Sequence, residues 1–282
     1  MEIIEKAPAK INLALDTPYK HKDGEPEWNM VMTSIDIADY VRIVDNNSGK
    51  ITVQSDSLFL PEDHRNLAYQ AADLIKNKFN IHLGVEITIR KNIPVSAGLG
   101  GGSSDAAAVL RGLNKIWNLK MSLEDLANLS LELDSDVPYC IFSKTAKVSG
   151  RGSNINPLHK LPSMYFVIVK PQVSISTPQI IRKINYKSIE HKNVNNLVQS
   201  IYQNDYTEIV NNMFNVLEPI SAEKHHEIYK IKMKMLNYGA DSAQMSGTGP
   251  TVFGVCKTEQ SAKHVFNSIR GFCSEVYLVH SL

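Results

Sequence analysis

The feature that most constrains this chain is a glycine-rich turn over 94–104, Pro-Val-Ser-Ala-Gly-Leu-Gly-Gly-Gly-Ser-Ser. Apolar β-branched residues alternate with polar ones just before it, which predicts a half-buried strand over 84–90. Apolar residues at helical spacing follow it and predict a helix over 105–117. Glycines in such a turn allow positive φ and close approach of the backbone, and the helix adds unpaired first-turn amides. A turn of this kind is suited to hold phosphate groups.

We expect most of this turn to bind phosphate, and we assign that role to Pro94, Gly98, Leu99, Gly100, Gly101, Gly102, Ser103 and Ser104. The alternative is a flexible Gly-Ser loop with Asp105 capping the helix, which fits the strand-turn-helix context less well. The turn lacks the Gly-Lys-Ser/Thr ending of a P-loop. It also does not fit a dinucleotide fingerprint, which needs GxGxxG early in a βαβ unit and an acid about 20 residues later.

The overall charge excludes a strongly electrostatic partner. Lys and Arg number 30 and Asp and Glu number 29, so the net charge is +1. We therefore expect neither nucleic acid nor a membrane surface as a partner. The three cysteines, Cys140, Cys256 and Cys273, are widely spaced, which favours a reducing compartment over disulfides or a zinc site. With no signal peptide pattern at its start, the chain is expected to be cytoplasmic.

The remaining patterns alternate between the two kinds of secondary structure and predict an α+β fold. Further strands are predicted at 8–13, 145–149, 164–169, 251–256 and 275–280. Further helices are predicted at 65–79 with Asp63 as N-cap, from the capping box at Ser122 to 133, and at 194–203, 207–216, 222–237 and 259–269. A segment rich in Gly, Asn and Pro over 150–162 is the best domain boundary. We place the two domains at 1–155 and 156–282.

Three motifs in this order resemble the GHMP kinases, the superfamily of galacto-, homoserine, mevalonate and phosphomevalonate kinases. They are Pro8–Leu13, the glycine-rich turn and Ser246–Phe253. The likeness covers nearly the whole chain and extends to shorter matches at Arg65–Leu67, Asp136–Tyr139 and Gly150–Gly152. The resemblance implies two domains, the first like domain 2 of ribosomal protein S5 and the second the C-terminal GHMP domain. It also implies an active site in the cleft between them, with ATP and Mg²⁺ as cofactors.

The resemblance assigns roles to individual residues. It implies that Asp136 is the general base for the acceptor hydroxyl, that Lys10 supports it, and that Asn12 lies near the acceptor. An ammonium beside a carboxylate keeps it ionised and offsets charge on the phosphoryl oxygens, which suits an alcohol attacking a phosphoryl group. Ser103 is a weak candidate for a Mg²⁺ ligand.

The third motif has two interpretations of equal weight. Gly247, Thr248 and Gly249 either form a simple hairpin turn or, as the resemblance implies, face the triphosphate and the acceptor. We include these three residues in the acceptor site.

The chain departs from the family on the acceptor side. Within the family it most resembles the kinases of 4-diphosphocytidyl-2-C-methyl-D-erythritol in non-mevalonate isoprenoid synthesis. Those kinases enclose the cytosine with a Tyr-His pair and a Phe, and this chain has Glu25, Pro26 and Ile181 there. Trp28 either replaces a lost aromatic wall or, as we favour, packs in the core. Asp134 replaces a family glycine. It either faces the cleft and raises the pKa of Asp136 or, more ordinarily, faces the surface.

Three functions follow from these residues. The first is a kinase of the cytidyl acceptor, and the second is a kinase of a different small alcohol, because the cytosine-binding residues are replaced. The third is a binding protein without catalysis, against which Lys10, Asn12 and Asp136 argue. A homodimer is compatible with the sequence.

Overall fold

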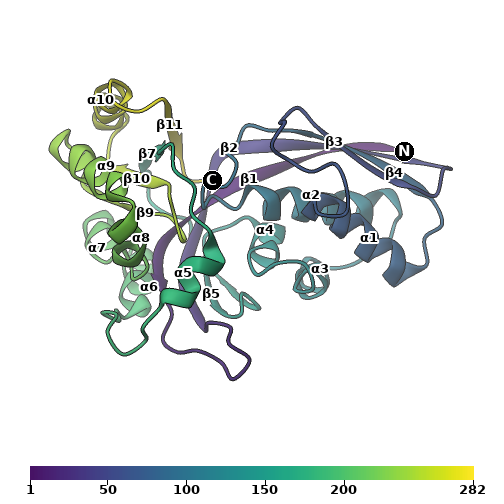
Figure 1. Ribbon diagram of the computed structural model, residues 1–282, viewed down its shortest axis with the longest axis horizontal. Coiled ribbons are helices and arrows are strands. Elements are labelled where there is room, and N and C mark those ends of the chain that lie inside the picture. Colours follow the sequence, from purple (N-terminus) through teal and green to yellow (C-terminus); the bar gives the residue numbers. More distant parts are fainter. The chain divides into compact units, whose positions relative to one another are not determined.

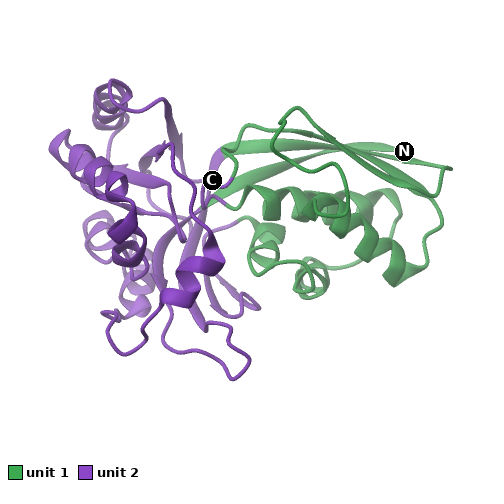
Figure 2. Cartoon of the chain, viewed as in Figure 1, with its two compact units in different colours: residues 1–10, 37–95, 100–143 green, residues 11–36, 96–99, 144–282 purple.

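The computed structural model covers residues 1–282 and divides into two compact units (Figure 1; Figure 2). Unit 1 comprises residues 1–10, 37–95 and 100–143, and unit 2 comprises residues 11–36, 96–99 and 144–282. Two strands, β1 (Glu2–Asp16) and β2 (Trp28–Asn46), and the glycine-rich turn contribute residues to both units. A domain boundary near residue 155 stays a prediction. Lys144 is the residue at which the chain last enters unit 2.

Unit 1 consists of a sheet with helices on one of its faces (Figure 2). Within it, β2 pairs antiparallel with β4 (Gly84–Arg90), and β4 pairs parallel with β3 (Ile51–Ser55). Its helices are α1 (Leu67–Phe79), α2 (Gly101–Ile116), α3 (Leu123–Ser130) and α4 (Val137–Phe142). Alanines are fully buried in both α1 and α2, which pack together, because small side chains allow close approach of two helices.

Unit 2 contains a four-stranded antiparallel sheet in the order β11-β7-β10-β9. These strands are β7 (Tyr165–Lys170), β9 (Ser242–Met245), β10 (Val252–Cys256) and β11 (Glu275–His280). The helices are α5 (Thr177–Lys183), α6 (Val194–Tyr202), α7 (Tyr206–Asn211), α8 (Glu218–Lys224), α9 (His226–Asn237) and α10 (Glu259–Arg270). The first residues of β2 pair with β5 (Ala146–Gly150), which pairs with β6 (Asn154–Pro157), and the short β8 (Phe214–Asn215) pairs parallel with the end of β1.

The predicted α+β class is confirmed, and several predicted element boundaries are wrong. Asn66, not Asp63, caps α1 through its side chain, and Asp63 instead accepts hydrogen bonds from Arg65. The helix after the glycine-rich turn starts at Gly101, so Asp105 lies inside it and does not cap it. The helix predicted at 222–237 is two helices that meet at His225. That predicted at 207–216 ends at 211, before β8.

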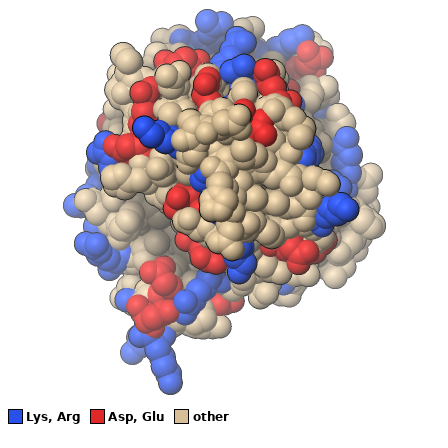
Figure 3. Space-filling view, turned by 90° about the vertical axis from the view of Figure 1, so that its right-hand side faces the viewer, with Lys and Arg blue, Asp and Glu red and all other residues tan.

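The surface charges agree with the near-neutral composition. On the face seen in Figure 3, blue basic groups and red acidic groups are interspersed.

All three cysteines are free thiols. None of the helices combines the length and the apolar character that crossing a bilayer requires.

Candidate functional site

The glycine-rich turn joins β4 to α2 in the geometry of an anion cradle. Gly100 is the N-cap of α2 with a φ of +68°, and the Ser104 amide donates to its carbonyl at 2.8 Å. No side chain caps this helix, so the amides of its first turn remain for another acceptor. The dipole of α2, a helix of 16 residues, favours negative charge at this end.

Close packing explains why the turn needs glycine. A Cβ on Gly100 would lie 2.8 Å from Lys10 Cγ, so any larger residue would displace that lysine. A Cβ on Gly101 would lie 3.2 Å from Ile93 Cγ2 and 3.3 Å from Lys91 Nζ. The side chains of Lys10, Lys91 and Ile93 therefore pack closely against the backbone of the turn.

The predicted catalytic pair is brought together in unit 1. Lys10 Nζ lies 3.1 Å from Asp136 Oδ2, and the two side chains are 5% and 28% exposed. Lys10 comes from β1, and Asp136 immediately precedes α4, whose Cys140 amide donates to the Asp136 carbonyl. A buried ammonium thus holds a carboxylate that keeps access to solvent, which is the arrangement a general base requires.

Asp134 connects this pair to the glycine-rich turn. Its Oδ1 accepts from Ser103 Oγ at 3.1 Å and from the Asp136 amide at 3.0 Å. The residue is exposed as a whole, as the surface interpretation expected, but its carboxylate turns toward these groups. Loss of hydration and, after it, the negative charge of Asp136 raise the pKa of Asp134.

Several residues of the turn are buried, among them Ser104 and Leu99. Ser104 is fully buried, and its hydroxyl donates to the Pro8 carbonyl at 2.8 Å. Leu99 is 1% exposed. The hydroxyl of Ser104 therefore fixes α2 to β1, whereas the half-buried Gly100 and the exposed Gly102 present backbone at the surface.

In unit 2 the third motif is the connection of a hairpin. β9 and β10 pair antiparallel, and Gly247 and Gly249 between them have φ values of +59° and +90°. The side chain of Asn215 donates to the carbonyls of Met245 and Gly247, both at 2.8 Å. The hairpin is therefore present, and polar side chains fix the shape of its loop.

The same loop contacts the tip of the glycine-rich turn within unit 2. Ser246 Oγ donates to the Gly98 carbonyl at 3.1 Å, and a Cβ on Gly98 would lie 2.7 Å from the Ser246 carbonyl oxygen. Thr248 is held by Ser221, whose Oγ donates to its carbonyl at 3.0 Å, and its hydroxyl lies 2.8 Å from that of Thr177. The hairpin and the triphosphate-facing interpretation are thus compatible with each other.

The other predicted acceptor residues of unit 2 are placed on β1, on the segment before β2 and on α5. Asn12 is 1% exposed, its Nδ2 donates to Met30 Sδ at 3.3 Å, and its carbonyl accepts from Gln244. Glu25 is exposed and Pro26 is buried. Ile181 on α5 is half-buried.

Trp28 begins β2, opposite Gly150 on β5, and is half-buried. It is therefore not part of the fully buried core that we favoured for it, and its role as a replacement aromatic wall stays a prediction.

Sequence analysis missed a buried charged cluster beneath the turn. Lys91 Nζ lies 2.7 Å from Asp105 Oδ2 and also pairs with Asp39 Oδ2. The three side chains are 8%, 3% and 0% exposed in that order. An acidic residue among the buried alanines of a helix was the signal that could have revealed it.

Comparison with known protein families identifies the family of this chain. The family model described as "GHMP kinases N terminal domain" matches residues 66–144, and "GHMP kinases C terminal" matches residues 197–275. Together they cover more than half of the chain. The chain belongs to the GHMP kinases. It is therefore an ATP-dependent phosphotransferase, as the sequence predicted.

Full-length relatives and solved structures agree with this membership. A protein of Ligilactobacillus salivarius named 4-diphosphocytidyl-2-C-methyl-D-erythritol kinase is 59% identical over 100% of this chain and 98% of its own. A protein of the same name from Pediococcus pentosaceus is 58% identical over all of both chains. A crystal structure of 4-(cytidine 5'-diphospho)-2C-methyl-D-erythritol kinase is 27% identical, with a TM-score of 0.81 over 100% of this chain and 99% of the other.

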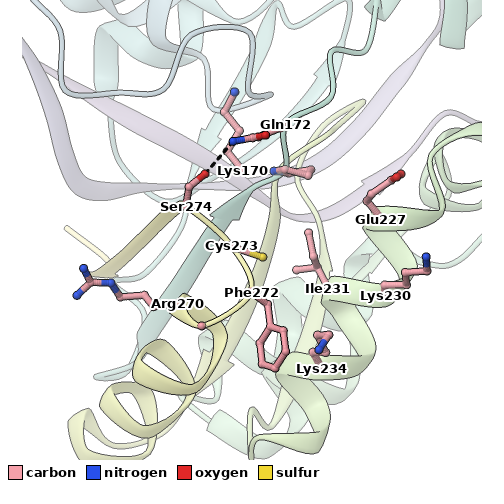
Figure 4. A pocket seen from close by; sticks show the side chains of 12 residues that line it. Lys170, Gln172, Glu227, Lys230, Ile231, Lys234, Arg270, Phe272, Cys273 and Ser274 are labelled. Atoms are coloured by element: carbon pink, nitrogen blue, oxygen red, sulfur yellow. Dashed lines mark hydrogen bonds between the residues drawn. The ribbon is translucent and has the colours of Figure 1, made fainter.

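A large cavity of this GHMP kinase lies away from all the predicted site residues. It has a volume of about 670 Å³ and lies in unit 2, at the ends of β7 and α10 and along one side of α9 (Figure 4). Ile231 and Cys273 point into it (Figure 4). Several basic side chains stand at its edge, and one of them, Lys234, lies 3.3 Å above the centre of the Phe272 ring. None of the predicted site residues is among those that line it.

Proposed function

We propose that this GHMP kinase transfers the γ-phosphoryl group of ATP to the 2-hydroxyl of 4-diphosphocytidyl-2-C-methyl-D-erythritol, a step in non-mevalonate isoprenoid precursor synthesis. The observation that carries the chemistry is the Lys10–Asp136 ion pair, with Nζ and Oδ2 3.1 Å apart. The names of the full-length relatives, 52–59% identical, support the acceptor.

Asp136 accepts the proton of the acceptor hydroxyl as the hydroxyl oxygen attacks the γ-phosphorus of ATP, whose bond to the bridging oxygen breaks to release ADP. The buried Lys10 pairs with this carboxylate and offsets the charge that develops on the phosphoryl oxygens. The amides at the start of α2 hold the phosphates, with Gly98, Gly100, Gly101 and Gly102 allowing the backbone to approach. Asn12 and the loop with Gly247, Thr248 and Gly249 contact the acceptor.

Mg²⁺ accompanies ATP in this proposal. It prefers oxygen ligands and commonly takes one or two carboxylates together with substrate phosphates. Ser103 Oγ and the Asp134 carboxylate, 3.1 Å apart, offer oxygens of this kind. When bound, the ion neutralises charge on the transferred phosphate.

The relatives support the cytidyl compound over a different small alcohol, which the replacements Glu25, Pro26 and Ile181 had suggested. An active site between the two family domains, a cytoplasmic location and a homodimer stay predictions.

Release of ADP in a coupled assay tests the function. The protein is incubated with ATP, Mg²⁺ and either 4-diphosphocytidyl-2-C-methyl-D-erythritol or, as matched control, 2-C-methyl-D-erythritol 4-phosphate, which lacks the cytidyl group. We expect turnover with the first and little with the second. Intact ATP binding without turnover of the cytidyl compound would overturn the acceptor. Faster turnover of another small alcohol would do the same.

A further inference from the structure

The Asp39–Lys91–Asp105 cluster connects the two ends of the glycine-rich turn. Asp39 Oδ1 accepts from the amides of Asn92 at 2.5 Å and Ile93 at 2.8 Å, the residues that lead into the turn. Lys91 Nζ reaches Asp105 Oδ2, on the first turns of the helix that leaves it. One buried cluster therefore holds both the residues that enter the turn and the helix that follows it.

The cluster also lies directly against the backbone of the helix start. The position of a Cβ on Gly101 would be 3.3 Å from Lys91 Nζ. A movement of the Lys91 head group would therefore change the packing against Gly101, the first residue of α2. The amides of this first turn are those that we assign to the phosphates.

Fold stability alone explains the cluster poorly. It buries two carboxylates with one ammonium, and Asp105 Oδ1 has no hydrogen-bond partner. Well-packed apolar residues often replace such buried ion pairs without loss of stability. What apolar residues lack is direction, because charged hydrogen bonds fix both the distance and the orientation of the groups they join.

We propose that Asp39, Lys91 and Asp105 are positioning residues, which hold the start of α2 in the geometry that nucleotide phosphates require. This inference rests on the proposed function, since it takes the phosphates to bind at that helix start. The side chains of all three residues are buried. They act through the backbone of residues 92–93 and 101–104, and their contribution is preorganisation of the amides.

Asp105→Ala and Asp105→Asn test the proposal in the full-length protein. Alanine removes the anchor, whereas asparagine keeps the size and an oxygen for Lys91. We expect alanine to raise KM for ATP and the Kd for ADP about tenfold or more while kcat falls less than about threefold, because misplaced binding groups weaken nucleotide binding first. Asparagine should restore most of the affinity. The Kd is measured by calorimetry with ADP, and folding is checked by circular dichroism.

Asn114→Ala is the matched control. Asn114 is a polar anchor on the same helix, far along from the turn, and it bonds both the amide and the carbonyl of Met121. It should lower stability without changing the Kd for ADP. If Asp105→Ala does not fold, Asp105→Glu replaces it. The longer side chain keeps the charge but displaces the helix start, and the same loss of ADP affinity is expected.

Two outcomes overturn the positioning role. One is folded Asp105→Ala or Asp105→Glu protein with wild-type ADP affinity, and the other is an equal loss in Asn114→Ala. If the wild-type protein itself binds no nucleotide, the proposed function has failed instead. Measuring wild-type binding first separates these cases.

Discussion

The site residues of the two units are held by different kinds of interaction. In unit 1, charged side chains position them: Lys10 pairs with Asp136, and Lys91 pairs with Asp39 and contacts the carboxyl group of Asp105. In unit 2, the loop after β9 is held by neutral hydrogen bonds, from Asn215 and Ser221 to backbone carbonyls.

This difference matches the tasks that we propose for the two parts. Charge is useful where a proton is taken up and phosphate is neutralised, because ionic groups act strongly in a partly dry site. Neutral hydrogen bonds are enough where a loop must only keep its shape. Substitutions in the first set should therefore alter catalysis and pH dependence, and those in the second set should alter stability and, through the shape of the loop, the KM for the acceptor.

The largest effect is expected from Asp136→Asn. The amide cannot accept the proton, so kcat should fall by about 10²–10⁴-fold while the Kd for ATP stays near that of the wild type. Steady-state kinetics and calorimetry measure the two quantities. Asp73→Asn, at an exposed aspartate of α1, is the control and should leave kcat unchanged. An unchanged kcat in Asp136→Asn would remove the base from the mechanism.

Asn215→Ala should lower the free energy of unfolding by about 1–3 kcal/mol, since it leaves the buried carbonyls of Met245 and Gly247 without their donor. Urea unfolding followed by circular dichroism measures it. Asn185→Ala, at an exposed position, is the matched control and should change the midpoint little. Equal effects of the two substitutions would contradict a special role for Asn215.

The pH dependence of stability should separate the two sets. Asp105 has an ordinary pKa of 3.8, and burial raises it to about 8. The folded protein thus keeps a proton that the unfolded chain releases. The unfolding free energy should therefore fall as pH rises from about 4 to about 8, by at most about 1.4 kcal/mol per pH unit, and then level off.

Urea unfolding at several pH values between 5 and 9 tests this dependence. Asp105→Asn should flatten the slope, whereas Asn215→Ala should shift the whole curve and keep its slope. A slope that Asp105→Asn leaves unchanged would show that another group holds the proton.

The smallest effect is expected from Arg42→Ala. Arg42 pairs with Glu2 at 2.7 Å, but both side chains are well exposed, so water and salt screen the pair. The urea midpoint should not move measurably. A clear shift would mean that charge stabilises this fold at its surface as well as beneath the turn.

What could be predicted from the sequence depended on how local the signal was. The glycine-rich turn, its flanking strand and its helix are contiguous, so pattern alone predicted them. β2 was missed because Thr33, Ser34 and Asp39 are buried and polar, which hides the alternation of the strand. The positions of Lys10 and Asp136 came from family resemblance, and their contact needed the fold.

The supporting residues could not be predicted because their partners are distant in sequence. Lys91 meets Asp39 across 52 positions, and Asn215 meets Met245 across 30. The partner of an isolated lysine after a strand, or of an isolated asparagine, cannot be predicted from the sequence pattern. Only the packed chain shows that the one holds a turn and the other a hairpin.

Neither compact unit is a single stretch of chain. Each consists of three segments, and the segments of the two units alternate along the sequence. No single cut in the gene can release either unit intact, so truncated forms are unsuited to assigning activities to halves. Synthesis on the ribosome also completes the two units at different times. Unit 1 is fully synthesised once residue 143 has emerged, while the early segments of unit 2 must wait for the last strand near the C-terminus.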